Sequence, residues 1–128
     1  MTETKVLVVD DAATVRMYHT RLLSEAGFTV GEAANGLEAV EAALSTAFDL
    51  FVVDVNMPKM NGYTCVETLR GETVGTARPV VMISTEDRAG DADRAYAAGA
   101  NLYMVKPVSA ERLVRVARML TAGRGVAE

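Results

Sequence analysis

The sequence predicts an α/β domain built on a parallel β-sheet with helices on both faces. Short apolar runs rich in β-branched residues alternate with longer amphipathic segments along the whole chain. The connections between them are short, and no internal repeat or low-complexity tract interrupts the alternation. Strands that alternate with helices are typical of a parallel sheet covered on both faces.

The first half of the chain contains two strands and two helices. Val6 to Val9 predicts the first strand, because this apolar run stops at two consecutive aspartates. Thr14 to Ala26 has helical spacing of apolar residues and is followed by a glycine, a common stop signal. Phe28 to Glu32 predicts the second strand. The Asn35-Gly36 turn then leads into a helix that runs through Leu44.

The middle of the chain contains the most apolar strand. Leu50 to Val53 is wholly apolar, which predicts a strand buried on both faces. Pro58 and Gly62 mark the loop after it, and a helix then runs to about Arg70. A fourth strand is expected at Val80 to Ile83.

The last elements follow the same pattern. A helix that begins at Arg88 or later and ends at Ala98 precedes the fifth strand, Leu102 to Val105. Ser109 is the expected N-cap of the final helix. The tail from Gly123 to Glu128 has no such pattern and is expected to be loose.

Length and composition indicate one domain, residues 1–128, with an ordered core at about residues 4–122. Hydrophobic residues make up 50% of the chain, enough for a packed core without disulfides or a structural metal, and Cys65 is the one cysteine. With 13 Lys and Arg against 17 Asp and Glu, the net charge is -4, so DNA is not an expected partner. Neither a signal-peptide pattern nor an apolar stretch of about 20 residues is present, so we expect a cytoplasmic protein without membrane insertion.

Chemically reactive residues follow four of the five predicted strands. They are Asp10 and Asp11 after the first, Asp54 after the third, Ser84 and Thr85 after the fourth, and Lys106 after the fifth. The carboxyl ends of parallel strands meet at one edge of the sheet, where such sheets bind ligands. Each residue alone could be an ordinary turn residue, but together they predict a functional site at that edge.

The predicted site has the chemistry of a magnesium-dependent phosphoacceptor. Clustered carboxylates repel one another, and a hard divalent cation relieves that repulsion. Oxygen ligands with open positions suit Mg²⁺, whereas Cys65 and His19 lie on different helices without zinc-ligand spacing. Lys106 would add a fixed positive charge toward a phosphoryl group. Asp54, alone at the end of the central apolar strand, is the best placed nucleophile for an aspartyl phosphate.

Sites for dinucleotides, nucleoside triphosphates and flavins have less support. The stretch DDAATVR lacks the glycine-rich turn that a dinucleotide site needs after its first strand, and no Walker sequence is present. A flavin phosphate at the same place would meet Asp10 and Asp11 directly, which is repulsive without a metal.

The stretches KVLVVDD, VDVNMPKMNG, VVMIST and YMVKP resemble those of the response-regulator receiver family in order and spacing. The resemblance covers essentially the whole chain and is strongest to single-domain chemotaxis response regulators, the CheY-like proteins. It implies a flavodoxin-like, doubly wound sheet of five parallel strands in the order 2-1-3-4-5. It also implies a cis peptide bond before Pro107.

The resemblance further implies a metal site and a phosphoacceptor. Asp54 would be the phosphoacceptor, and Asp11 and Asp54 would bind Mg²⁺ through their carboxylates. Asn56 would contribute its backbone carbonyl to the metal. Asp10 would hold a metal-bound water or support the site.

The resemblance also assigns the switch residues. Ser84 corresponds to the switch hydroxyl, Tyr103 to the switch aromatic residue and Lys106 to the phosphate-contacting lysine. Thr85 departs from the family pattern, which commonly has a small residue there, so rates of phosphotransfer and dephosphorylation do not carry over.

The function implied by this family is a two-component signalling switch, which is not an enzyme beyond its own phosphorylation and dephosphorylation. A histidine kinase would phosphorylate Asp54, and the altered surface would bind a downstream protein such as a flagellar motor switch component in chemotaxis. Because the 128 residues hold no output domain, action through another molecule is expected. A monomer is expected, and a phosphatase is a further candidate partner.

Two alternatives remain open at this point. The chain could be a phosphate shuttle or sink that passes the phosphoryl group to a phosphotransfer protein without an effector of its own. It could also be a small phosphatase, although Asn56 stands where aspartate phosphatases carry a second acid.

Three further features have both a structural and a functional reading. His19 is expected to be an exposed helix residue. Tyr103 either covers an edge strand or acts as a switch. Arg112, Arg115 and Arg118 form either a solvated helix face or a docking face for an acidic partner or an anionic nucleotide.

Overall fold

The computed structural model describes residues 3–57, 60–71, 78–85 and 90–122. Three predictions fall outside the described residues: the loop proline Pro58, a helix start at Arg88, and the loose tail from Gly123 to Glu128.

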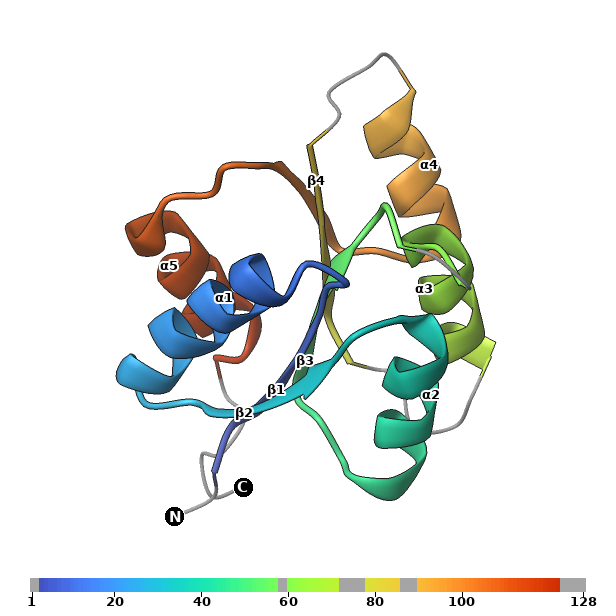
Figure 1. The fold of residues 1–128 in the computed structure, drawn as a ribbon. Coiled ribbons are helices and arrows are strands. Elements are labelled where there is room, and N and C mark those ends of the chain that lie inside the picture. The colour runs from blue at the N-terminus through green and yellow to red at the C-terminus, as the bar shows by residue number, and fades with distance from the viewer. Residues whose placement is uncertain (1–2, 58–59, 72–77, 86–89, 123–128) are drawn as a thin grey trace.

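Five parallel strands form one sheet in the order β2-β1-β3-β4-β5 (Figure 1). The strands are β1 Lys5–Val9, β2 Thr29–Ala33, β3 Leu50–Asp54, β4 Val80–Ser84 and β5 Leu102–Val105. The doubly wound, flavodoxin-like fold and its strand order, which the family resemblance implied, are therefore confirmed. The strand order reverses between β1 and β3, the place where open α/β sheets bind ligands.

Helices cover both faces of the sheet. They are α1 Ala13–Glu25, α2 Gly36–Ser45, α3 Gly62–Gly71, α4 Asp91–Ala98 and α5 Ala110–Leu120. Figure 1 shows α1 and α5 side by side on one face, and α2, α3 and α4 on the other. Every strand and helix predicted from the sequence is present, and where their ends differ they do so by about one residue because terminal turns fray.

The core has two layers because strand side chains alternate between the two faces. In β3, Phe51 and Val53 pack under α2, α3 and α4, whereas Leu50 and Val52 pack under α1 and α5. All residues of β3 and β4 are buried, which confirms the prediction that β3 is covered on both faces. Each large side chain that is fully buried contributes about 1.5–3 kcal/mol.

Side-chain caps stabilise the starts of α5 and α2. Ser109 Oγ accepts a hydrogen bond from the Arg112 amide at 3.2 Å, which confirms Ser109 as the N-cap of α5. Asn35, predicted as part of a turn, is the N-cap of α2, because its Oδ1 accepts from the Glu38 amide at 2.9 Å. In the described segments, every helix is too short or too polar to traverse a bilayer.

The start of α3 packs directly against the end of β3. The Gly62 amide donates to the Val55 carbonyl at 2.8 Å. A Cβ atom on Gly62 would overlap the Asp54 carbonyl oxygen and lie 2.7 Å from Val55 Cα. Both obstacles are backbone atoms, so glycine is what allows α3 to approach the strand that carries Asp54.

Candidate functional site

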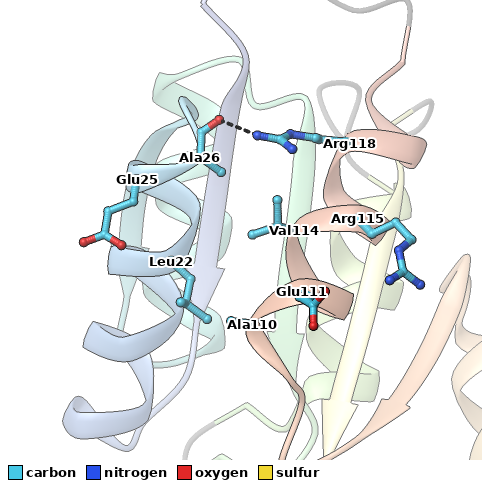
Figure 2. A pocket seen from close by; sticks show the side chains of 8 residues that line it. All are labelled: Leu22, Glu25, Ala26, Ala110, Glu111, Val114, Arg115 and Arg118. Carbon is cyan, nitrogen blue, oxygen red and sulfur yellow. Dashed lines mark hydrogen bonds between the residues drawn. The ribbon is translucent and has the colours of Figure 1, made fainter.

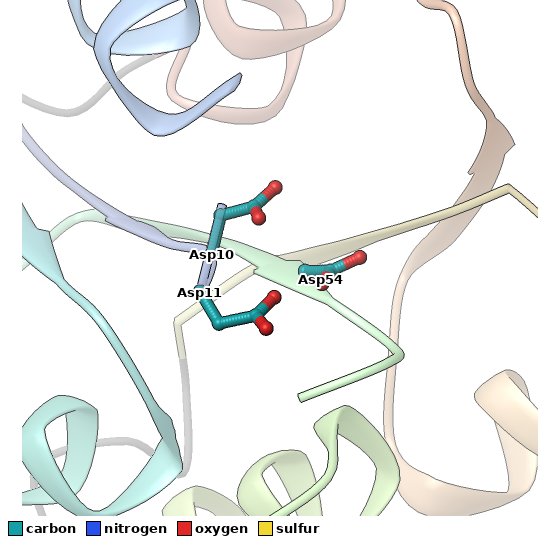
Figure 3. Close-up of side chains that lie close together, drawn as sticks. All are labelled: Asp10, Asp11 and Asp54. Carbon is teal, nitrogen blue, oxygen red and sulfur yellow. The ribbon is translucent and has the colours of Figure 1, made fainter. Parts of the chain in front are cut away.

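Three aspartates meet at the carboxyl edge of the sheet (Figure 3). Asp10 and Asp11 directly follow β1, and Asp54 is the last residue of β3. One carboxylate oxygen from each lies within 4.8 Å of the others. Asp10 and Asp54 are buried, whereas Asp11 is exposed. The side-by-side register of β1 and β3, with Val9 opposite Val53, produces this proximity.

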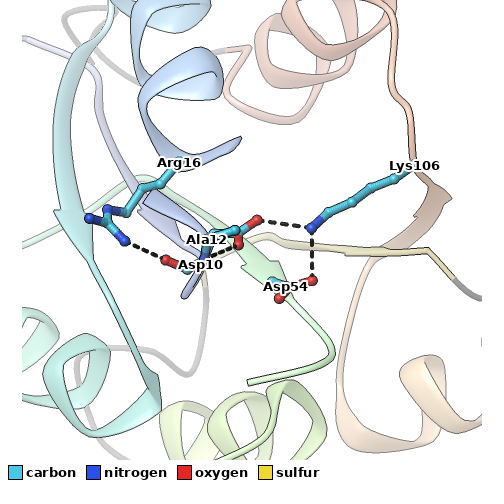
Figure 4. Close-up of polar contacts among 5 residues, drawn as sticks. All are labelled: Asp10, Ala12, Arg16, Asp54 and Lys106. Atoms are coloured by element: carbon cyan, nitrogen blue, oxygen red, sulfur yellow. Dashed lines mark hydrogen bonds and ion pairs between the residues drawn. The ribbon is translucent and has the colours of Figure 1, made fainter. Parts of the chain in front are cut away.

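Lys106 connects two of these aspartates from the opposite side of the site (Figure 4). Its Nζ lies 3.0 Å from Asp10 Oδ2 and 3.1 Å from Asp54 Oδ1. The three side chains are 14%, 3% and 5% exposed, so solvent screens these ion pairs weakly. A single ammonium group therefore faces two buried carboxylates.

Burial and the neighbouring charges alter the acidity of Asp54. Burial, and then the negative charge of Asp10, raise its pKa from 3.8 to about 6, although Lys106 opposes this shift. Burial by itself lowers the pKa of Lys106, but hydrogen bonds and charges from Asp10 and Asp54 outweigh burial and raise it. Lys106 is therefore a fixed positive charge, whereas the Asp54 carboxyl loses its proton less readily than an ordinary aspartate does.

Asp10 and Asp11 have different bonding despite their adjacency. Asp10 Oδ1 accepts from the Ala12 amide at 2.9 Å and Oδ2 accepts from Lys106, so both carboxylate oxygens of Asp10 are engaged. The Asp11 carboxylate makes no hydrogen bond or ion pair with any other described residue. Within the described part of the chain, Asp11 is thus the one aspartate of the three whose carboxylate has no such contact.

Arg16 is a site residue that sequence reasoning missed. Its Nη1 donates to the backbone carbonyl of Asp10 at 2.7 Å (Figure 4). Its Nε pairs with Glu32 Oε1 at 3.0 Å. No sequence motif marks this arginine, because the contact depends on how α1 turns back over the ends of β1 and β2.

Comparison with known proteins identifies the family. Residues 6–118 match the family model described as the response regulator receiver domain. The chain belongs to this family. The probable transcriptional regulatory protein SilR of Salmonella typhimurium is 33% identical over 120 residues, which cover 93% of this chain and 52% of SilR. The transcriptional regulatory protein CusR of Escherichia coli is 34% identical over 123 residues, 95% of this chain and 53% of CusR.

A solved relative has the same architecture. Chemotaxis protein CheY4 of Vibrio cholerae superimposes with a TM-score of 0.89 at 34% identity, covering 93% of this chain and 99% of CheY4. The resemblance to CheY-like single-domain regulators is therefore confirmed. The receiver domain spans about half the length of the curated transcriptional regulators it matches.

The remaining predicted site residues of the receiver domain differ in how far they are buried. Ser84 is fully buried at the end of β4, and Thr85 next to it is exposed. Tyr103 is half-buried in β5 and packs against the core under α2, α3 and α4. Asn56 is exposed in the loop after β3. The Lys106-Pro107 peptide bond is cis, as the family resemblance implied.

The prediction that His19 is exposed was wrong. His19 lies on the buried face of α1 together with Leu23 and is 4% exposed. It lines a pocket of about 530 Å³ between α1 and the loop after β5. Lys106, Thr85 and Pro107 also line this pocket. Burial lowers the pKa of His19; the negative charge of Asp10 opposes that shift, and the positive charge of Lys106 adds to it.

The three C-terminal arginines do not share one groove. Arg115 and Arg118 line a groove of about 560 Å³ between α1 and α5 with Glu25 and Glu111, but Arg112 does not (Figure 2). Arg118 Nη2 donates to the Ala26 carbonyl at 3.2 Å across this groove. The groove therefore carries both signs of charge, and the proposed acidic partner gains no specific support from it.

Proposed function

We propose that this receiver domain accepts a phosphoryl group on Asp54 and acts as a switch in two-component signalling. One observation carries the proposal: the Asp54 carboxylate ends the central strand, beside two further carboxylates and 3.1 Å from the Lys106 ammonium. This combination supplies a nucleophile, a cation-binding surface and a fixed positive charge at one point.

The donor set fits Mg²⁺. Hard oxygen ligands within 4.8 Å of one another suit this ion, and a bound cation would oppose the burial and the Asp10 charge that raise the pKa of Asp54. Asp11 and Asp54 would hold the ion through carboxylates and Asn56 through its backbone carbonyl. Asp10, whose carboxylate oxygens are both engaged within the protein, would support the site or hold a metal-bound water. When bound, Mg²⁺ neutralises charge on the phosphoryl oxygens.

The reaction is a transfer from a phosphohistidine of a histidine kinase. An oxygen of ionised Asp54 attacks phosphorus, the new P–O bond forms and the P–N bond breaks. The imidazole leaves with the electron pair and takes a proton. Lys106 holds its positive charge beside the acceptor oxygen, where it stabilises the charge on the transferring group. In this proposal the receiver domain catalyses only this transfer and the later hydrolysis of the aspartyl phosphate, in which water attacks and the Asp54 carboxylate and inorganic phosphate are released.

The switch depends on residues next to the acceptor. In the proposal, the Ser84 hydroxyl donates to the new phosphoryl group and Tyr103 turns inward into the space that Ser84 leaves. The buried position of Ser84 at the end of β4 and the half-buried Tyr103 on β5, which is adjacent to β4, support this coupling. The surface formed by α4, β5 and α5 then changes its affinity for a partner.

The downstream partner is proposed as a protein, such as a flagellar motor switch component in chemotaxis. The single-domain chemotaxis relative supports this assignment, whereas the curated relatives are transcriptional regulators. The alternative is a shuttle or sink that passes the group to a phosphotransfer protein. A partner whose affinity changes when Asp54 is phosphorylated would favour the switch over the shuttle.

Phosphorylation with a small donor tests the central claim. The wild type, incubated with acetyl phosphate and Mg²⁺, should gain the mass of one phosphoryl group, and chelation of Mg²⁺ should prevent the gain. Asp54→Asn should remove it. The matched control Asp93→Asn, an exposed aspartate of α4, should leave it intact. Phosphorylation retained in Asp54→Asn overturns the assignment.

A further inference from the structure

Arg16 holds the turn that carries the two consecutive aspartates. Its guanidinium donates from Nη1 to the Asp10 carbonyl at 2.7 Å and from Nε to Glu32 at 3.0 Å. Glu32 lies on β2, so the arginine of α1 connects the end of β1 to the neighbouring strand. The Arg16 side chain is 18% exposed, so it is packed into this position.

We propose that Arg16 is a positioning residue that orients the Asp11 carboxylate for metal binding, an inference that rests on the proposed function. The Asp10 carbonyl and the Asp11 amide belong to one planar peptide group. A hydrogen bond that holds the carbonyl oxygen therefore also sets the direction in which the Asp11 Cα carries its side chain.

Asp11 needs such a constraint more than its neighbours do. Asp10 is held through both carboxylate oxygens, and Asp54 is held by Lys106 and by its place in a central strand. The exposed Asp11 carboxylate contacts no other described residue through a hydrogen bond or ion pair. Its orientation thus depends on the backbone that Arg16 holds, and residues that orient metal ligands typically change metal affinity by about 10–100-fold when lost.

The ion pair with Glu32 serves orientation more than stability. Glu32 is 41% exposed, and ion pairs with such exposure contribute little to folding. Loss of Arg16 is therefore expected to affect the site much more than the fold. A second ion pair of α1, Arg21 with Glu25, is 79% and 63% exposed and does not contact the β1–α1 turn, so Arg21 provides a matched control.

Mg²⁺ titration of Arg16→Met and Arg21→Met tests the proposal. Calorimetry should show the Kd for Mg²⁺ raised about tenfold in Arg16→Met and unchanged in Arg21→Met. The rate of phosphorylation by acetyl phosphate at saturating Mg²⁺ should stay within about twofold of wild type, because the acceptor and Lys106 are untouched. Arg16→Lys, which keeps one donor, should recover part of the affinity.

Amide exchange without metal provides an independent measurement. The Ala12 amide, which donates to Asp10 Oδ1, should exchange about tenfold faster by NMR in Arg16→Met than in Arg21→Met. Equal Mg²⁺ affinities and equal exchange rates in these two variants would overturn the role of Arg16. Absence of Mg²⁺ uptake by the wild type would instead overturn the proposed function, while exchange at Ala12 would still report whether Arg16 holds the turn.

Discussion

The ammonium group of Lys106 lies 3.1 Å from Oδ1 of Asp54, although 52 positions separate the two residues in the chain. The same group lies 3.0 Å from Asp10 Oδ2. One cation therefore opposes two buried carboxylates, and burial, together with the negative charge of Asp10, makes Asp54 a weaker acid than an ordinary aspartate.

Removal of Lys106 should raise the pKa of Asp54 further. In Lys106→Met, both the opposing charge and the hydrogen bond to Asp54 are lost, so its pKa should rise above about 6. Asp10→Asn should shift it the other way, because the charge of Asp10 raises it. Carboxyl NMR titration without metal measures both shifts. An unchanged Asp54 pKa in both variants would contradict the electrostatic account.

Asp54→Asn should stabilise the metal-free protein at neutral pH. The folded state binds the Asp54 proton more tightly than the unfolded state, since the pKa is raised from 3.8 to about 6. The stabilisation that Asp54 contributes is therefore lost as the pH rises from 3.8 to about 6, and it is absent at higher pH. Each pKa unit corresponds to about 1.4 kcal/mol, and loss of a partner for Lys106 offsets part of the gain.

Urea denaturation measures this gain. We expect an increase of about 1–2 kcal/mol in the unfolding free energy of Asp54→Asn near pH 7.5, which disappears near pH 4. Equal unfolding free energies of the wild type and the variant near pH 7.5 would argue against a raised pKa of Asp54 in the folded state.

His19 should make the fold sensitive to mild acid. Burial lowers its pKa in the folded state below the ordinary value of 6.5, so the unfolded state takes up the proton first as pH falls. Stability from neutral His19 is present above about pH 6.5 and is lost as pH falls through that value and then through the lowered folded pKa. His19→Leu has a similar volume and cannot titrate. Its unfolding free energy should fall less than that of the wild type between about pH 7 and about pH 5; parallel curves would refute this role.

Gly62→Ala should be strongly destabilising. The added Cβ would meet the backbone of Asp54 and Val55, which cannot yield as a flexible side chain can. We expect a loss of about 2–3 kcal/mol in urea denaturation, and weaker Mg²⁺ binding because β3 must shift. Gly71→Ala, at the other end of α3, meets nothing within 4 Å and is the matched control. A Gly62→Ala protein as stable as Gly71→Ala would contradict the contact.

Much of the fold could be read from local patterns. The apolar runs at Leu50 to Val53 and Val80 to Ile83 are buried strands, and Ser109 caps α5 as its position indicated. These features depend on residues close together in the chain, whose periods of about 2 and 3.6 are visible in the sequence. The strand order came from resemblance to a family, because periodicity does not specify which strands are neighbours.

Some features of the site could be predicted from the sequence and others could not. The sequence alone predicted that Asp10, Asp11, Asp54 and Lys106 lie at one edge of the sheet. Each follows a predicted strand, and parallel strands end at the same edge. Only the tertiary structure decided that Arg16 reaches the Asp10 carbonyl, that His19 turns inward, and that Gly62 contacts the Asp54 backbone. The tertiary structure also decided the pKa of Asp54, because burial and the distances between charges are set only when distant segments of the chain pack together. The chain determined which chemical groups stand at the strand ends, and packing determined how those groups are oriented, shielded from water and charged.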